Sequence, residues 1–358
     1  MKDFVLTLGR TSTLFNKHGK TNKGKYQIQD YVVDNSIKWT TDLNFSAGQL
    51  DFELQETKHP IIPYTGDAIS FVWQGHKIFY GRVFKYSVDE SNRVKVTCYD
   101  NTRYLKNQDS IVFKAGTLSE RFSEVLSHAG LSGKVVAGSG HKLKPEVDDS
   151  KSYFDMLKNA IDQTATATGQ RYFVLANYGS IELRKVPYKR LNIVVGSKSG
   201  MTGFTYSVDI ENTYNSIRVV QKNEKKSQST SATAKGKDKG GSDDASNTSF
   251  TATGVKGKSV AQWGVLQEVI NAKEKANEAQ MLEQAKGELK LKNNANKTLS
   301  IECIGNVDLV AGNAVTIKIT DLNKKISNCP IVKAVHTFGT DYKCSLEMKA
   351  GESWQANS

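Results

Sequence analysis

The residues best suited to acid–base or nucleophilic chemistry are scattered along this chain. The histidines are His18, His59, His76, His128, His141 and His336. No serine stands in a GxSxG turn that would expose a nucleophile. His336 lies in the strand-like run VKAVHTFG beside a turn, where a structural or surface role is the simplest interpretation. The sequence therefore predicts no catalytic residue, and we expect the protein not to be an enzyme.

Two places in the sequence carry adjacent carboxylates. Asp148 and Asp149 begin a helix-like segment, where acids favour the positive end of the helix dipole. Asp243 and Asp244 lie in a polar, low-complexity segment. Neither pair resembles the acid and base that flank a scissile glycosidic bond.

The cysteines show neither metal-ligand spacing nor a CxxC pair. They are Cys98, Cys303, Cys329 and Cys344. Three of them (98, 303 and 344) lie in alternating, strand-like runs, which predicts buried free thiols that act as small hydrophobic residues. We expect no metal site, and no residue pattern predicts a cofactor site.

The formal net charge of +12 is unevenly distributed. Residues 1–30 hold six basic and two acidic groups, and residues 222–258 hold eight lysines and four acids. These two segments carry most of the excess, so no folded basic face with interleaved aromatic residues is predicted. We expect no specific nucleic-acid binding. The chain also lacks a run of about 18 apolar residues, so we expect no membrane insertion by the protein itself.

Residues 26–104 alternate with the period of two that is typical of β-strands. The alternating sets are Ile37, Trp39 and Thr41; Leu50, Phe52 and Leu54; Ile69, Phe71 and Trp73; Tyr80, Phe84, Tyr86 and Val88; and Val94, Val96 and Cys98. Polar turns separate them. This pattern predicts a small barrel or sandwich over residues 1–104.

The period changes in the next segment, where helices are predicted. Thr117 and Glu120 have the spacing of a capping box, and Gly130 can end that helix. A second helix is expected after Asp149 or Ser150. A hairpin turning at NYGS follows. Residues 105–190 are therefore predicted to form a small α+β module.

The last part of the chain, residues 191–358, again reads as strands. Within it, residues 222–258 are rich in Ser, Thr, Gly, Lys and Asp, which predicts a mobile loop. A helix with a stripe of small residues is expected at 271–291, and three or four strands follow it.

Residues 66–113 resemble the PBSX-type baseplate hub proteins of contractile phage tails, in the late-control-D and tail-hub superfamily. The match consists of FYG.VF at 79–84 and VT.YD..RYLKN at 96–107. The family's alanine between Thr and Tyr is replaced by Cys98, another small residue. Four later runs, WGVLQEVINA, LSIECIG, VAGNAVTIKI and VKAVHTFGTDYKCSLEM, resemble the C-terminal part of the same superfamily.

The resemblance implies a mainly β fold with an inserted α+β module and two tail-tube-like β-barrel domains, at residues 1–104 and 191–358. Such hubs are expected to form homotrimers whose six barrels make a pseudo-sixfold ring. Implied partners are the tail tube or a tube-initiator protein, the central spike protein and a baseplate adaptor or LysM-type tail protein. The implied location is the baseplate of a virion or tail-like particle, which is assembled in the host bacterial cytoplasm. The particle would be a phage, a defective prophage or a bacteriocin.

Two other functions stay open. A tail-associated peptidoglycan hydrolase would need a lytic domain, for which the residues after the last expected strand leave no room. A cell-wall-binding protein would expose tryptophan platforms, whereas Trp39 and Trp73 alternate into expected cores; Trp263 and Trp354 are not placed by the pattern.

Overall fold

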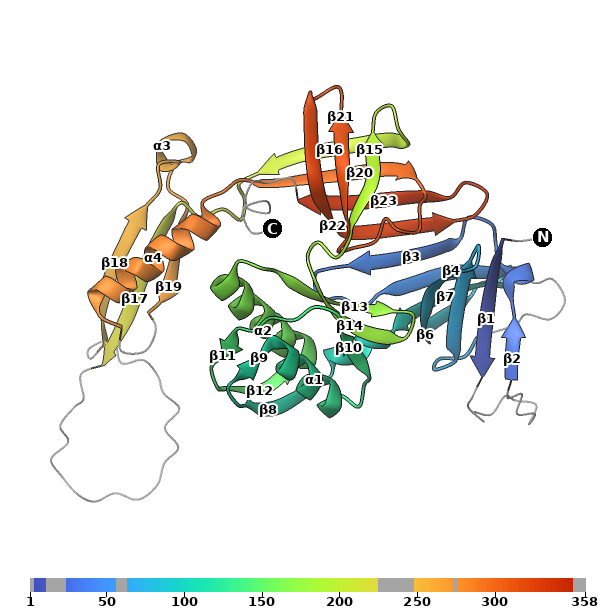
Figure 1. The fold of residues 1–358 in the computed structure, drawn as a ribbon, viewed down its shortest axis with the longest axis horizontal. Coiled ribbons are helices and arrows are strands. Elements are labelled where there is room, and N and C mark those ends of the chain that lie inside the picture. The colour runs from blue at the N-terminus through green and yellow to red at the C-terminus, as the bar shows by residue number, and fades with distance from the viewer. Residues whose placement is uncertain (1–2, 11–23, 56–62, 225–247, 273–275, 350–358) are drawn as a thin grey trace, which may run out of the picture. The chain divides into compact units, whose positions relative to one another are not determined.

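The computed structural model describes residues 3–10, 24–55, 63–224, 248–272 and 276–349. Two compact units are present, residues 1–207 with 298–358 and residues 208–297. Most strands of the larger unit join in one 13-stranded sheet (Figure 1). The expected class, mainly β with an inserted α+β module, is confirmed. None of the described helices is long and apolar enough to cross a membrane.

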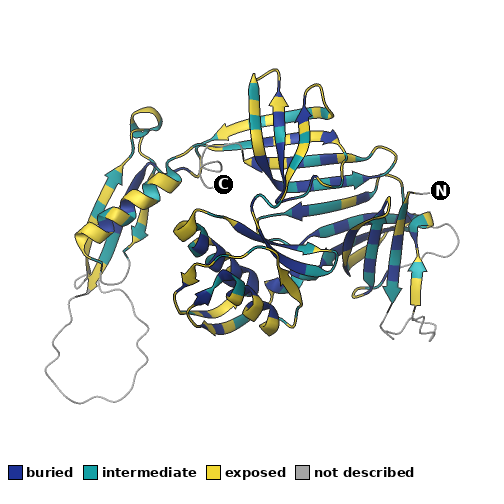
Figure 2. Cartoon of the chain, viewed as in Figure 1, coloured by how far each residue is buried: buried dark blue, intermediate teal, exposed yellow. Residues whose placement is uncertain are grey.

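The first β region follows the predicted alternation. Its elements are β1 (Phe4–Arg10), β2 (Gly24–Gln27), the 3-10 helix η1 (Gln29–Tyr31), β3 (Ile37–Asp42), β4 (Gln49–Gln55), β5 (Ala68–Trp73), β6 (His76–Val88) and β7 (Arg93–Asp100). The strands lie in the order β3-β4-β7-β6-β5-β1-β2. Along β4, Leu50, Phe52 and Leu54 are buried and the residues between them are not, and Figure 2 shows buried and more exposed residues along the strands of this region. These inward side chains build one aromatic-rich core.

The hairpin of β6 and β7 contains a bulge that the alternation did not reveal. The register of the two strands shifts by one residue at Phe84. Tyr86 therefore pairs with the core residue Val96, while the ring of Phe84 packs 5.4 Å from that of Tyr99 on the other face. The expectation that Phe84 shares a face with Tyr86 is wrong, because one extra residue reverses the alternation.

The α+β module has a core of its own. Its elements are η2 (Asn101–Lys106), β8 (Gln108–Phe113), β9 (Gly116–Thr117), α1 (Leu118–His128), β10 (Gly133–Val135), β11 (Lys142–Leu143), β12 (Glu146–Ser152), α2 (Tyr153–Thr168), β13 (Tyr172–Asn177) and β14 (Ser180–Lys185). The capping box of Thr117 and Glu120 is present. Helix α2 begins later than predicted, because the Ser152 side chain accepts from the backbone N–H of Asp155. The two helices pack together over a core of apolar side chains.

The turn between β13 and β14 attaches the module to the first β region. Its Tyr178 adopts a left-handed conformation, with φ of 43°. The Tyr178 hydroxyl lies 2.7 Å from that of Ser70, and Asn101 donates to the carbonyl of Gly179 at 2.9 Å. Tyr80 lies 5.9 Å from Tyr178, ring to ring. These contacts fix the module against β5 and β6.

The second β region continues the same sheet. Its strands are β15 (Arg190–Gly196), β16 (Met201–Asp209), β20 (Asn296–Ile304), β21 (Ala314–Ile319), β22 (Lys324–Phe338) and β23 (Lys343–Lys349). The order β16-β20-β23-β22 continues into β3, where Ala334 pairs with Thr41 and His336 with Trp39. This region has a separate, mostly aliphatic core.

The described part of the smaller unit consists of three strands, a short helix and the predicted helix. They are β17 (Ser216–Glu224), β18 (Thr248–Lys256), the short helix α3 (Val260–Trp263), β19 (Gln267–Asn271) and α4 (Glu278–Lys292). Met281 and Ala285 of α4 pack on Ile217 and Val219 of β17. The loop expected at 222–258 is wrong at both ends, because its first and last residues pair as β17 and β18. Residues 225–247, with Asp243 and Asp244, lie outside the described residues. Helix α4 begins later than expected, since Asn277 caps it.

Candidate functional site

The aspartate of the motif VTCYD ends the first β region and starts the module. Asp100 is the N-cap of η2, and its carboxylate accepts from the backbone N–H of Thr102 at 2.9 Å and also from the Thr102 hydroxyl. Burial raises the pKa of Asp100 to about 6, against the lowering effect of these hydrogen bonds. The role of Asp100 is therefore to turn the chain from a strand into a helical segment.

The glycine of the motif FYG permits close approach of two strands. A β-carbon at Gly81 would overlap the carbonyl oxygen of Tyr99 and the ring of Phe79. Any larger residue would push β6 away from β7, so the motif demands glycine for packing and not for chemistry.

His336 lies in the interior of the sheet, in contact with a tyrosine and a thiol. Its Nε2 lies 3.1 Å from the Leu309 carbonyl, its Nδ1 lies 2.8 Å from the Tyr342 hydroxyl, and the Sγ of Cys344 lies 3.1 Å from Nδ1. Because a carbonyl only accepts, Nε2 carries the proton and Nδ1 accepts from Tyr342. Burial lowers the pKa of His336 to about 4 and raises the pKa of the Cys344 thiol to about 11.

These pKa shifts decide what the contact between His336 and Cys344 can do. A nucleophilic cysteine needs a thiolate, which a nearby imidazolium stabilises. Here both groups are neutral near pH 7, and neither His336 nor Cys344 is exposed to solvent. The arrangement is a packed polar contact inside a core, and no substrate can reach it.

The other residues suited to chemistry form surface or packing contacts: His128 Nδ1 lies 3.3 Å from a carboxylate oxygen of Asp109 at the surface, and Cys303 pairs across the sheet with Cys344. Asp148 and Asp149 lie in strand β12 and not at a helix start, because α2 begins only after Ser152. Asp148 is buried and accepts from Lys151 Nζ at 2.6 Å, whereas Asp149 accepts from Ser110. All four cysteines are buried and free. Among the described residues, no three His, Cys, Asp or Glu side chains gather as a metal site would require.

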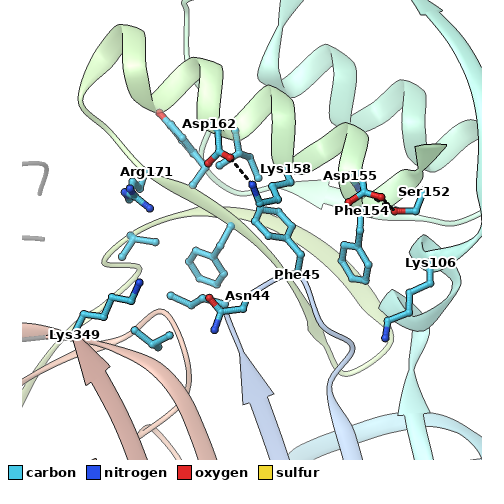
Figure 3. A pocket seen from close by; sticks show the side chains of 16 residues that line it. Asn44, Phe45, Lys106, Ser152, Phe154, Asp155, Lys158, Asp162, Arg171 and Lys349 are labelled. Carbon is cyan, nitrogen blue, oxygen red and sulfur yellow. Dashed lines mark hydrogen bonds and ion pairs between the residues drawn. The ribbon is translucent and has the colours of Figure 1, made fainter. Parts of the chain in front are cut away.

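A groove of about 650 Å³ lies in the larger unit, where the module meets the main sheet (Figure 3). Its walls come from several parts of the chain, among them the segment after β3 with Phe45, η2 with Lys106, helix α2 with Phe154, the start of β13 with Phe173, and the end of β23 with Lys349. No sequence signal marked this groove, because its walls are far apart in the sequence.

The chain is similar to two proteins of Bacillus subtilis (strain 168), the protein YqbQ and the phage-like element PBSX protein XkdQ. Each is 28% identical over 263 residues, which cover 73% of this chain and 74% of the relative. A tail protein from Neisseria meningitidis MC58 has a similar structure, with a TM-score of 0.66 at 12% identity over 99% of this chain and 98% of that one. The PBSX-type resemblance drawn from the motifs is confirmed. The family model that matches residues 37–349 shows that this chain belongs to the YQBQ-like family.

Proposed function

We propose that this chain is the structural hub of a contractile phage-tail baseplate. Its relatives include a protein of a phage-like element, and its fold is that of a tail protein, which supports a structural role in a phage tail. Three copies would form a pseudo-sixfold ring that joins the tail tube, or a tube-initiator protein, to the central spike protein. The particle would be a phage or a tail-like bacteriocin.

The observation that carries this proposal is the pair of β regions in one chain. Each has its own core, and the two are joined edge to edge by the pairing of β22 with β3. A chain with two such regions supplies two of the six positions around a ring, so three copies match a sixfold tube. In this proposal residues 1–104 and 191–358 are the tube-like regions, the second interrupted in sequence by the smaller unit at 208–297, and residues 105–190 are the module between them.

The outer strands of the sheet favour assembly between copies. Among the described strands, β2 and β16 end the main path of the sheet, and each is paired on one side. An open edge offers unpaired N–H and C=O groups to another chain, and ring closure removes such edges. Val208 on β16 is 53% exposed, which is consistent with a contact that forms only on assembly.

The oligomeric state tests the ring. Size-exclusion chromatography with light scattering, together with negative-stain imaging, is expected to show trimers and rings, alone or with the tube protein added. Val208→Lys would place a charge at the β16 contact and weaken self-association by about tenfold or more. The matched control is Val112→Lys on β8, which is 69% exposed and should assemble normally. Monomers under every condition would contradict the ring.

We also propose that the protein has no enzymatic activity. The contact between His336 and Cys344 is closed to solvent, which supports this proposal. Purified protein is therefore expected to leave a suspension of bacterial cell walls turbid. If the protein clears the suspension, and a single point substitution abolishes this clearing, the result would favour the alternative, a tail-associated peptidoglycan hydrolase.

A further inference from the structure

The groove between the module and the main sheet has an apolar floor. Phe154 and Phe173 are buried, and Phe45 is half-buried beside them. The rings of Phe45 and Phe154 meet edge to face, with centroids 6.3 Å apart. This floor sits in a cavity of about 650 Å³, which is within the range of pockets that bind small ligands or a few side chains.

The segment that presents Phe45 holds an unfavourable backbone conformation. Phe45 has φ of 52°, in the left-handed region, which costs an aromatic residue on the order of 1 kcal/mol. The turn is held by Asp42, whose carboxylate accepts from the backbone N–H of Asn44 at 2.8 Å. Strained residues of this kind occur often where side chains are positioned for binding.

The charges around the floor are mostly positive. Lys106 lies at one end of the groove, Lys349 and Arg171 lie at the other, and Phe45 and Phe154 lie between them (Figure 3). Both ends therefore carry cationic side chains on either side of an apolar centre.

The two carboxylates of the groove are already engaged by neighbouring groups. Asp162 accepts from Lys158 Nζ at 2.9 Å, and Asp155 accepts from the Ser152 hydroxyl at 2.5 Å. By contrast, neither Lys106 nor Lys349 has an ion-pair partner in the part of the chain that the structure describes. The groove is thus complementary to a ligand with negative charge at both ends.

We propose that this groove binds an acidic peptide segment of a partner protein. An apolar side chain of the peptide would pack against the half-buried Phe45, and its carboxylates would pair with Lys106 and Lys349. A single-stranded nucleic acid fits less well, because base stacking needs exposed ring faces. Phe154 is 4% exposed and Phe173 is 2% exposed. The groove is distinct from the edge strands β2 and β16, so this inference does not depend on the ring.

Fluorescence anisotropy with a short labelled peptide tests the inference. The probe is fluorescein-DDLFEE, and two comparison probes remove either charge (NNLFQQ) or the apolar anchor (DDGSEE). We expect saturable binding of the acidic probe with Kd below about 1 mM, weakened by added salt. Each comparison probe should bind at least about fivefold more weakly.

Charge reversal on the protein locates the binding. The double variant Lys106→Glu/Lys349→Glu is expected to lower the affinity about tenfold or more. Both lysines are exposed, so the variant should fold, which circular dichroism and Tm would verify. The matched control, Lys134→Glu/Lys325→Glu, reverses two exposed lysines outside the groove and should bind as the wild type does.

Several results would overturn the inference. The first is that the acidic probe does not bind saturably. The second is that the control variant loses as much affinity for the probe as the groove variant does. The third is that all three peptides bind with the same affinity. Tighter, variant-sensitive binding of a labelled oligothymidine would instead indicate a nucleic-acid site. If the protein self-associates, and the groove variant abolishes this while the control variant does not, a second copy of this chain would be the ligand of the groove.

Discussion

The two β regions of the larger unit share one sheet but differ in what fills them. The core of the first contains large aromatic rings, among them Phe52, Phe71, Trp73 and Phe79. The core of the second consists mainly of Ile, Leu, Val, Ala and Met side chains with three thiols. Both follow the same alternation along their strands, so the repeated geometry depends on the inward positions being apolar and not on which apolar residues occupy them.

Strand β22 belongs to both regions. Its middle residues Cys329, Ile331 and Ala334 lie in the aliphatic core, and its last residue, Phe338, is buried in the aromatic core of the first region. The Phe338 ring lies 4.9 Å from that of Phe71, 5.0 Å from Trp73 and 4.8 Å from Tyr342. Tyr342 packs against both cores, so Phe338 reaches the second core through the ring of Tyr342.

The largest expected effect comes from removing the Phe338 ring. Phe338→Ala should lower the free energy of unfolding by about 3–5 kcal/mol, since it leaves a cavity in the aromatic core beside Tyr342. Denaturant unfolding followed by tryptophan fluorescence measures this. The matched control is Phe250→Ala on β18, which is 63% exposed and should cost less than about 0.5 kcal/mol. A loss below about 1 kcal/mol for Phe338→Ala would show that the cores are independent.

Each region contains a buried titratable group, so the two regions should differ in how their stability depends on pH. The pKa of Asp100 is raised to about 6, so the folded state binds more protons and stability falls as pH rises from about 4 to 6. The pKa of His336 is lowered to about 4, so the unfolded state binds more protons and stability rises as pH rises from about 4 to 6.5. The two effects have opposite signs and similar size, so they largely cancel in the wild type.

Single variants should reveal each slope. In the His336→Gln variant only the pH dependence due to Asp100 remains. The free energy of unfolding of this variant should therefore fall by on the order of 3 kcal/mol as pH rises from 4 to 6. Asp100→Asn leaves the His336 effect, and stability should rise over the same range. Urea unfolding at several pH values measures both. Parallel pH profiles for the two variants would contradict the assigned burial of these groups, because other titrating residues affect both profiles equally.

A smaller difference in stability is expected between a glycine substitution in the tightly paired strands of the first region and one in an edge strand of the second region. Gly81→Ala should cost about 2 kcal/mol, because its β-carbon would overlap the Tyr99 backbone. Gly203→Ala on β16 meets only the β-carbon of Glu302, at 3.9 Å, and should change the free energy of unfolding by less than about 0.5 kcal/mol. Thermal unfolding of both variants measures the difference. Equal costs would mean that β6 and β7 can separate without loss.

Much of the fold could be read from local patterns. Alternation in residues such as Leu50, Phe52 and Leu54 predicted strands, and the Thr117–Glu120 spacing predicted the start of α1, because these signals depend on near neighbours. The bulge at Phe84 could not be predicted, since it depends on the pairing with another strand. The loop expected at 222–258 was too wide because β18 has few apolar residues and gains its strand structure from pairing with β17.

The sequence by itself determined the class of the protein, the order of β regions and module, and the family, through motifs of adjacent residues. Only the tertiary structure decided that the β regions share one sheet, that His336 is neutral and inaccessible beside Cys344, and that Phe45, Lys106 and Lys349 line one groove. The physical reason is the range of the interactions. Alternation and capping act over a few residues, whereas strand pairing, desolvation and cavities depend on contacts between separate segments, some of them hundreds of residues apart, such as β3 and β22.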